Sequence, residues 1–366
     1  MNNFEKPQLL PYLGRFTLLF LSTYYVIGLP FLAFQAALPE SGRIALDFYE
    51  TFRPFSLMAV AGQMLRGLAF ALVFYPFYNI LFKSSHGRLI MFGAMWGVAI
   101  FGSVEPQPGS IEGIIYTTIP FTEHLYALAA IALQMLLFVW LFIKWETLSR
   151  KRTGTVPHSS VGDMKEPEGP GGFKTLQDQE GPGSVGISGN MEDKGSTGSA
   201  TKSESPGSFE GPAYLPEKLR GYTTRFLVVH LVTYWVVGSI FYQIAGYADA
   251  LEEMEVFELW RPLENITAVL LVFFGQIFRG AFLGLLLAPF YGNYINKKNG
   301  WLLLFLLMVG LTALGSPLFL HEFILFEGTF MEFLSDLVIG IPEIVTQMLV
   351  FSLIFFWWQR KAERKK

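Results

Sequence analysis

Cysteine is absent from the 366 residues of this chain. Its absence excludes disulfide bonds, thiol catalysis, cysteine-ligated zinc and cysteine-bound iron–sulfur clusters. The sequence also lacks a phosphate-cradling glycine-rich loop, a nucleophile-elbow serine and an HExxH pair. Its five histidines show no metal-ligand spacing with acidic residues. We therefore expect no metal and no cofactor, and we do not expect an energy-coupled pump that acts alone.

Charged residues are scarce, at 16% of the chain against roughly 25% in soluble domains. There is no basic stripe, so no nucleic-acid partner is expected. Hydrophobic residues make up 52% and recur in runs of about 20, the length of a membrane-crossing helix. The sequence predicts an all-α integral membrane protein whose surroundings are the lipid bilayer. Eight transmembrane helices are expected, at residues 16–38, 55–82, 89–104, 125–145, 226–248, 266–291, 301–318 and 337–358.

Between the fourth and fifth expected helices the composition changes to Gly, Ser, Pro, Glu and Lys. Such a segment has too little apolar surface to offset the entropy lost on ordering. Residues 153–216 are therefore predicted to form a disordered cytoplasmic linker between two membrane units, 1–152 and 217–366.

Basic residues near the helix ends predict the orientation in the membrane. They cluster before the first and fifth expected helices, after the second and sixth, and after the fourth and eighth, while the opposite loops are acidic. Both termini and the linker are expected to be cytoplasmic, in a plasma or inner membrane.

The two membrane units share polar and backbone-shaping residues in the same order. Apolar composition alone produces chance matches of Leu and Phe, but not of Arg, Gln, Glu, Pro and Gly together. Four helices per unit give both units the same orientation, so we expect parallel repeats related by a pseudo-two-fold axis along the membrane normal. The matched pairs include Arg15/Arg225, Gln63/Gln276, Arg66/Arg279, Gly67/Gly280, Pro76/Pro289, Glu112/Glu327 and Gln134/Gln347.

Two arginines define a polar layer at the centre of the membrane. Arg66 and Arg279 fall near the middle of the second and sixth expected helices. A charge at that depth costs about 2.5–3.5 kcal/mol on insertion scales, so both should face the protein interior or a wet cavity. Amide side chains are expected at a similar depth, namely Gln63, Gln276, Gln134 and Gln347.

Acidic residues are expected to neutralise these arginines. Glu343, in the eighth expected helix, is the clearest intramembrane acid, and its counterpart in the first unit is Ala130. Glu112 and Glu327 are equivalent acids on the outer side, each followed by Gly, in apolar segments that can fold back toward the arginines.

Three functions remain open from the sequence. The first hypothesis is a transporter or channel-like permease for a small anionic or amphipathic solute, bound by the arginine layer between the units. In the second, Arg, Gln and Glu only tie the helices together, and the chain is a structural or accessory subunit that assembles with further copies or another membrane protein. The third is a membrane enzyme acting on lipid head groups through Glu112, Glu327 and His124.

Overall fold

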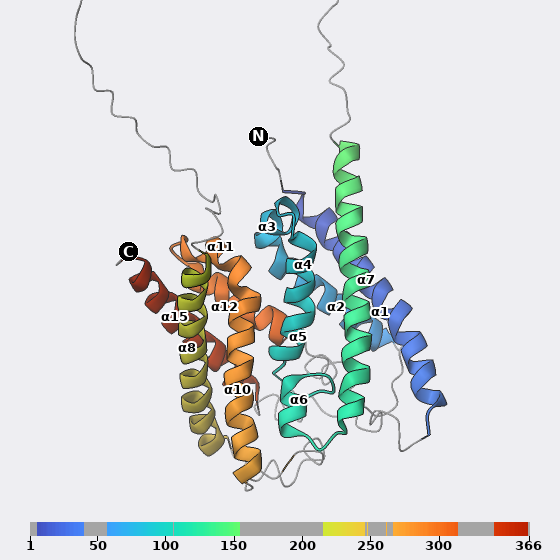
Figure 1. Cartoon of the computed structure of the whole chain (residues 1–366). Helices are drawn as coiled ribbons and strands as arrows, with labels where there is room; N and C mark the ends of the chain where they lie inside the picture. The colour runs from blue at the N-terminus through green and yellow to red at the C-terminus, as the bar shows by residue number, and fades with distance from the viewer. Residues whose placement is uncertain are drawn as a thin grey trace, which may run out of the picture. The chain divides into compact units, whose positions relative to one another are not determined.

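The computed structural model describes residues 6–39, 57–104, 106–153, 215–245, 247, 261, 266–313 and 340–364. These residues are almost entirely helical and include no β-strand. Most of the predicted linker and the acidic residues Glu105 and Glu327 lie outside the described part of the chain. The two membrane units belong to one compact body (Figure 1).

The first unit begins and ends with a long helix, and shorter helical pieces lie between the two. Pro76 lies where the second helix tightens into a 3-10 turn, as expected of a residue without a backbone N–H. A π-helical turn interrupts the third helix. The elements are α1 (Leu9–Ala37), α2 (Leu57–Phe74), η3 (Tyr75–Phe77), α3 (Tyr78–Lys83), α4 (Gly87–Phe92), η4 (Gly93–Gly97), α5 (Val98–Phe101), α6 (Ile111–Tyr116) and α7 (Phe121–Thr153).

The second unit has a similar order of elements. Pro289 again begins a 3-10 turn, here at the end of α10. The elements are α8 (Leu215–Ile244), α10 (Ile266–Leu287), η6 (Ala288–Phe290), α11 (Tyr291–Ile295), α12 (Gly300–Thr312) and α15 (Ile341–Glu363).

Six of the described helices are long and apolar enough to cross a membrane, which makes this a polytopic membrane protein. Two shorter apolar helices, Gly87–Phe101 and Gly300–Thr312, coincide with the third and seventh expected spans, so the count of eight stays a prediction. The six long helices are Leu9–Ala37, Val60–Lys83, Phe121–Ser149, Lys218–Ile244, Ile266–Ile295 and Ile341–Glu363.

Interlocked aromatic rings hold the helices of each unit together. The rings of Phe16 and Phe138 are 4.7 Å apart, and Phe138 stacks on the next turn of α7. In the second unit Phe226 lies 4.6 Å from Phe351 in the same way. Lipid chains are as apolar as these side chains, so close van der Waals packing rather than exclusion from water stabilises the contact.

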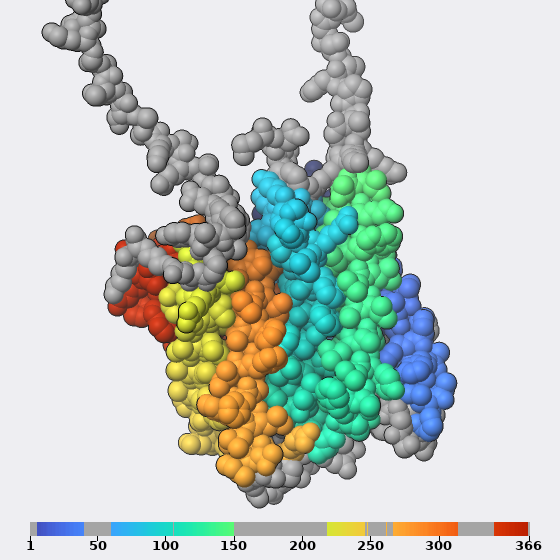
Figure 2. Space-filling model, viewed as in Figure 1, coloured from blue at the N-terminus to red at the C-terminus, as the bar shows by residue number. Residues whose placement is uncertain are grey.

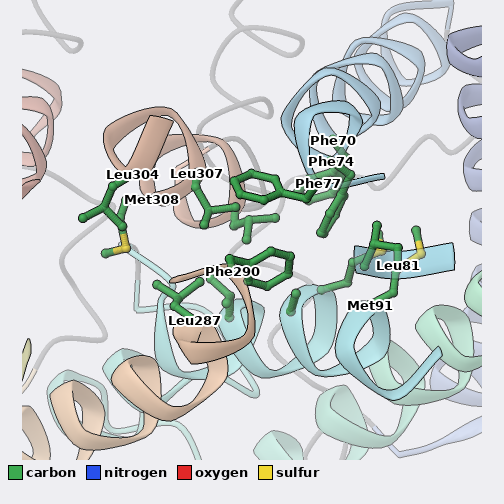
Figure 3. Packing of buried hydrophobic residues seen from close by; sticks show 14 of the residues in the cluster. Phe70, Phe74, Phe77, Leu81, Met91, Leu287, Phe290, Leu304, Leu307 and Met308 are labelled. Atoms are coloured by element: carbon green, nitrogen blue, oxygen red, sulfur yellow. The ribbon is translucent and has the colours of Figure 1, made fainter. Parts of the chain in front are cut away.

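The contact between the two units is also aromatic and closely packed. α10 lies between α8 and the α4–α5 segment on the face shown in Figure 2. Near Pro76 and Pro289, rings and aliphatic side chains of both units fill the interface, with Phe77 edge-on to Phe290 at 5.0 Å (Figure 3). A solute site between the units must therefore lie at a different depth in the membrane from this packed contact.

Basic residues from both units meet at one end of the bundle. Lys6, which precedes α1, bonds to the carbonyl of Pro76, and Asn293 of α11 reaches the same oxygen. Burial lowers the pKa of Lys6, and the charge of Lys297 lowers it further. Lys6 and Lys297, which the charge pattern assigns to the same side of the membrane, thus lie close together.

Near this end a polar tie, which is a set of hydrogen bonds between polar side chains, links the first and last helices of each unit. In the first unit Glu146 accepts hydrogen bonds from Arg15 Nε at 2.5 Å and from the Tyr78 hydroxyl at 2.8 Å. At the corresponding place in the second unit, Gln359 Oε1 accepts from Arg225 Nε at 2.5 Å, and its Nε2 donates to a tyrosine hydroxyl at 2.9 Å. An amide in one unit thus takes the place of a carboxylate in the other.

This correspondence predicts how Glu146 tolerates change. Glu146→Ala should lower the free energy of unfolding by about 1.5–3 kcal/mol, because it removes charged hydrogen bonds at a buried site. Glu146→Gln should cost less than half as much, since Gln359 already bonds to the equivalent residues of the second unit, Arg225 and Tyr291. Thermal unfolding of the two purified variants in detergent measures the difference, and equal losses would contradict the equivalence.

Candidate functional site

The candidate site is built around Arg279, in the middle of α10 and only 7% exposed. Its Nε donates to the carbonyl oxygen of Phe101 at 2.7 Å, and Nη2 donates to that of Ser103 at 3.0 Å. Nη1 forms an ion pair with Glu112 and lies 3.3 Å from Gln276 Oε1. All three guanidinium nitrogens are bonded to protein atoms, and three of the four partners belong to the first unit.

A break in the first unit brings these partners to Arg279. Helix α5 ends at Phe101, and the described residues before α6, 102–104 and 106–110, are non-helical. At the start of α6 the side chain of Ser110 accepts a hydrogen bond from Gly113 N at 2.9 Å. Gly109 turns the chain with a positive φ of 85°. A side chain on Gly113 would collide with the carbonyl of Gln107, so the turn needs glycine there. Arg279 thus satisfies carbonyls that the break leaves without helical partners.

Gln276 connects the ion pair to a histidine. It is fully buried one turn before Arg279, and its Nε2 donates to Glu112 Oε1 at 3.1 Å. Its Oε1 lies 3.2 Å from His230 Nε2, and because a carbonyl oxygen can only accept, the histidine donates. The position of His230, occupied by Phe20 in the first unit, is therefore part of the site.

Two tyrosines close one side of the network. The hydroxyl of Tyr116, the last residue of α6, bonds to that of Tyr234 on α8. The backbone N–H of Arg261 donates to the carbonyl of Tyr116 at 2.7 Å, which fixes the end of α6 from the second unit. Among the described side chains, Arg279 and Glu112 thus form an ion pair, and amide, hydroxyl and imidazole groups lie around it.

Only some of the predicted site residues meet here. Arg279, Gln276 and Glu112 come together, as expected for an acid that folds back toward an arginine. Arg66 is buried on α2, and its Nη1 lies 3.5 Å from Gln63 Oε1. Glu327, the counterpart of Glu112, lies outside the described residues.

Glu343 bonds to neutral groups rather than to an arginine. Tyr247 donates to its Oε2 at 2.6 Å, and Gln347, one turn further along α15, donates to its Oε1 at 2.8 Å. Gln134 is half-buried on α7, outside the set of side chains that surround Arg279. Within the part of the chain that the structure describes, the predicted layer thus consists of several groups, and the Arg279 network links the two units.

Glu112 and His124, the two residues of the lipid-enzyme hypothesis that the structure describes, are buried and bonded to other protein groups. Glu112 is 6% exposed and paired with Arg279. His124 is 1% exposed and accepts a hydrogen bond from Gly109 N at 3.0 Å through Nδ1. Within the described ranges, no three His, Asp or Glu residues gather as a possible metal site.

Sequence reasoning missed the two tyrosines. Tyr116 carries no periodic signal, because it lies on a six-residue helix beside the break. The substitution of His230 for Phe20 was the one available clue.

Comparison with known proteins provides no further guide. No protein-family model matches this chain, and searches of curated proteins and of solved structures find no match. The functional argument therefore depends on the geometry alone.

Proposed function

We propose that this membrane protein is a transporter or channel-like permease for a small anionic or amphipathic solute, with the Arg279 network as its binding site. The observation that carries the proposal is the buried Arg279–Glu112 pair, which joins a broken segment of one unit to a helix of the other. Discontinuous helices between repeated units form the sites of many secondary transporters. Irregular backbone at membrane depth is tolerated where it is buried in protein or lines a wet cavity.

The proposal includes the architecture of two parallel four-helix repeats, with both termini and the linker cytoplasmic. Equivalent contacts in the two units support it. Gly67 packs against Thr17 and Phe20, and Gly280 packs against the corresponding residues Leu227 and His230. The ring stacks and the polar ties at Glu146 and Gln359 repeat in the same way.

Solute binding in this scheme requires the ion pair to open. Because Glu112 and Gln276 occupy both N–H groups of Nη1, an anionic group takes the place at Nη1 only when Glu112 leaves. Gly102, between α5 and the break, is packed against Thr312 and provides a position where the segment can bend. Movement of this segment relative to α10 would expose the arginine to one side of the membrane.

Single cysteines test this proposal directly, because the natural chain has none. Ser103 and Ser352 are both buried serines, the first beside Arg279 and the second within the aromatic packing of α15. In membrane vesicles a small, water-soluble thiol reagent should modify Ser103→Cys at least tenfold faster than Ser352→Cys, since only the former borders a path for water. Equal, negligible rates at the two positions would contradict a permease site.

The four hydrogen bonds from Arg279 to protein atoms favour a second candidate, the structural or accessory subunit. An arginine bonded in this way can simply fasten the broken segment to α10. This candidate predicts that Ser103→Cys stays unreactive and that Arg279→Gln disrupts assembly with a membrane partner or with further copies. Native mass spectrometry of the purified Arg279→Gln variant measures that loss. Unchanged assembly, together with a reactive Ser103→Cys, would instead favour the permease.

A further inference from the structure

We infer that the group recognised by Arg279 is a single carboxylate, and that the side chain of Glu112 occupies its place while the site is empty. This inference rests on the proposed function and names the substrate class of the same site: a monocarboxylate with an apolar tail. It follows from the donors that converge on Glu112, from the charge of the network and from the side chains beside it.

The donors match one carboxylate oxygen. Glu112 Oε1 receives Arg279 Nη1 and also Gln276 Nε2, the latter at 3.1 Å. Gln276 is held in this orientation because its own oxygen accepts from His230. A solute carboxylate in the same position would find both donors already aimed at it, with no rearrangement of the amide.

The charge of the network favours a monoanion. Arg279 is the cation in contact with Glu112, and Gln276, which also donates to Glu112, is an uncharged amide. Exchange of Glu112 for a monocarboxylate leaves the buried charge balanced. A phosphate dianion would bring a second negative charge into a buried site without a partner, which is costly in a low-dielectric interior.

The tail requirement follows from competition with Glu112. A tethered side chain competes at an effective concentration in the millimolar range or above. A bare carboxylate therefore binds poorly, and a useful ligand needs further contacts. Aromatic rings lie beside the carbonyl that Arg279 holds: Phe101 stacks on Phe282 at 4.7 Å, and Phe278 lies 4.4 Å from Phe282.

Chemical rescue tests the inference without knowledge of the natural solute. Glu112→Ala leaves a carboxylate-sized space next to Arg279. Acetate or propionate should raise the Tm of the purified variant by about 2–4 °C relative to sodium chloride of equal ionic strength, because a ligand that binds only the folded state stabilises it. Sodium phosphate should give no such increase.

Matched variants decide between the explanations. Glu112→Ala/Arg279→Met lacks the cation and should not respond to carboxylates, and the wild type should respond little because Glu112 fills the place. Glu112→Ser, which keeps a hydrogen-bond acceptor, replaces Glu112→Ala if the alanine variant does not accumulate. The inference is overturned if chloride or phosphate raises the Tm of Glu112→Ala as much as acetate does. It is also overturned if acetate raises the Tm of neither Glu112→Ala nor Glu112→Ser.

The two proposals can fail separately. Rescue by acetate together with an unreactive Ser103→Cys would leave a carboxylate subsite in a protein that is not a permease. A reactive Ser103→Cys without rescue would leave the permease and remove the carboxylate as its substrate group.

Discussion

Replacement of Glu112 by alanine is expected to lower the free energy of unfolding by about 3–5 kcal/mol, the usual cost of removing one partner of a buried ion pair. Interhelical hydrogen bonds in membranes contribute only about 0.6 kcal/mol on average. The larger figure applies here because the variant leaves the charge of Arg279 buried without its counter-ion, and that cost exceeds the loss of a neutral bond. Denaturant titration in detergent, followed by tryptophan fluorescence, measures the change.

A double variant separates the charge from the packing. Glu112→Leu/Arg279→Met removes both charges and keeps similar volume, so it should regain at least half of the stability lost in Glu112→Ala. Such replacements of buried pairs by apolar residues are often neutral or stabilising. A double variant as unstable as the single one would show that the carbonyls of Phe101 and Ser103, rather than the charge, dominate the effect.

Gly300→Ala should be among the most damaging single substitutions in the second unit, with an expected loss of about 3 kcal/mol or more, at the upper end of overpacking effects. A methyl group there would collide with the carbonyl oxygen of Tyr294 and lie 2.7 Å from the ring of Phe356. The first of these atoms is backbone, so a rotamer change cannot relieve the clash. Gly87→Ala meets the carbonyl of Leu81 in the same way and should cause a similar loss.

The matched control lies on the preceding helix. Gly292 has no atom within 4 Å of the position that a side chain would take. Gly292→Ala should therefore be neutral or stabilise the protein by up to about 1 kcal/mol, since alanine favours a helix over glycine. Size-exclusion profiles and Tm values of the three variants test the comparison, and a stable Gly300→Ala would mean that the turn before α12 is not as close as described.

The sequence predicted the membrane class because apolar runs and scarce charge follow directly from the requirements of a bilayer. It also predicted that Arg279 is buried with Gln276 one turn away, because both properties depend on spacing within a single helix. The sequence predicted that Glu112 folds back toward an arginine, but it did not predict which one. Its choice of Arg279 rather than Arg66 depends on how the units pack, and nothing local to residues 105–116 specifies that.

Three other features could not be predicted from sequence patterns, because each depends on contacts between distant parts of the chain. The third helix ends at Phe101, close to its expected end at residue 104, and the Gly, Ser and Pro residues that follow are typical of a loop. The sequence could not reveal that Arg279 of the other unit holds the carbonyls of this loop. Tyr116 and Tyr234 are 118 residues apart and contact each other only through tertiary packing. Glu343 was assigned to the arginines because an intramembrane acid needs a partner, but its partners among the described residues are the uncharged side chains of Tyr247 and Gln347.

The pairing of Glu112 with Arg279 also has a consequence for how the protein is made. The two residues are separated by 167 positions, so at ordinary elongation rates the ribosome produces the arginine roughly 10–30 s after the glutamate. During that interval Glu112 lacks its eventual partner, and the carbonyls of Phe101 and Ser103 lack the hydrogen bonds that Arg279 donates. The final arrangement of the segment that contains Phe101, Ser103 and Glu112 is therefore a late step in biogenesis, which waits for α10.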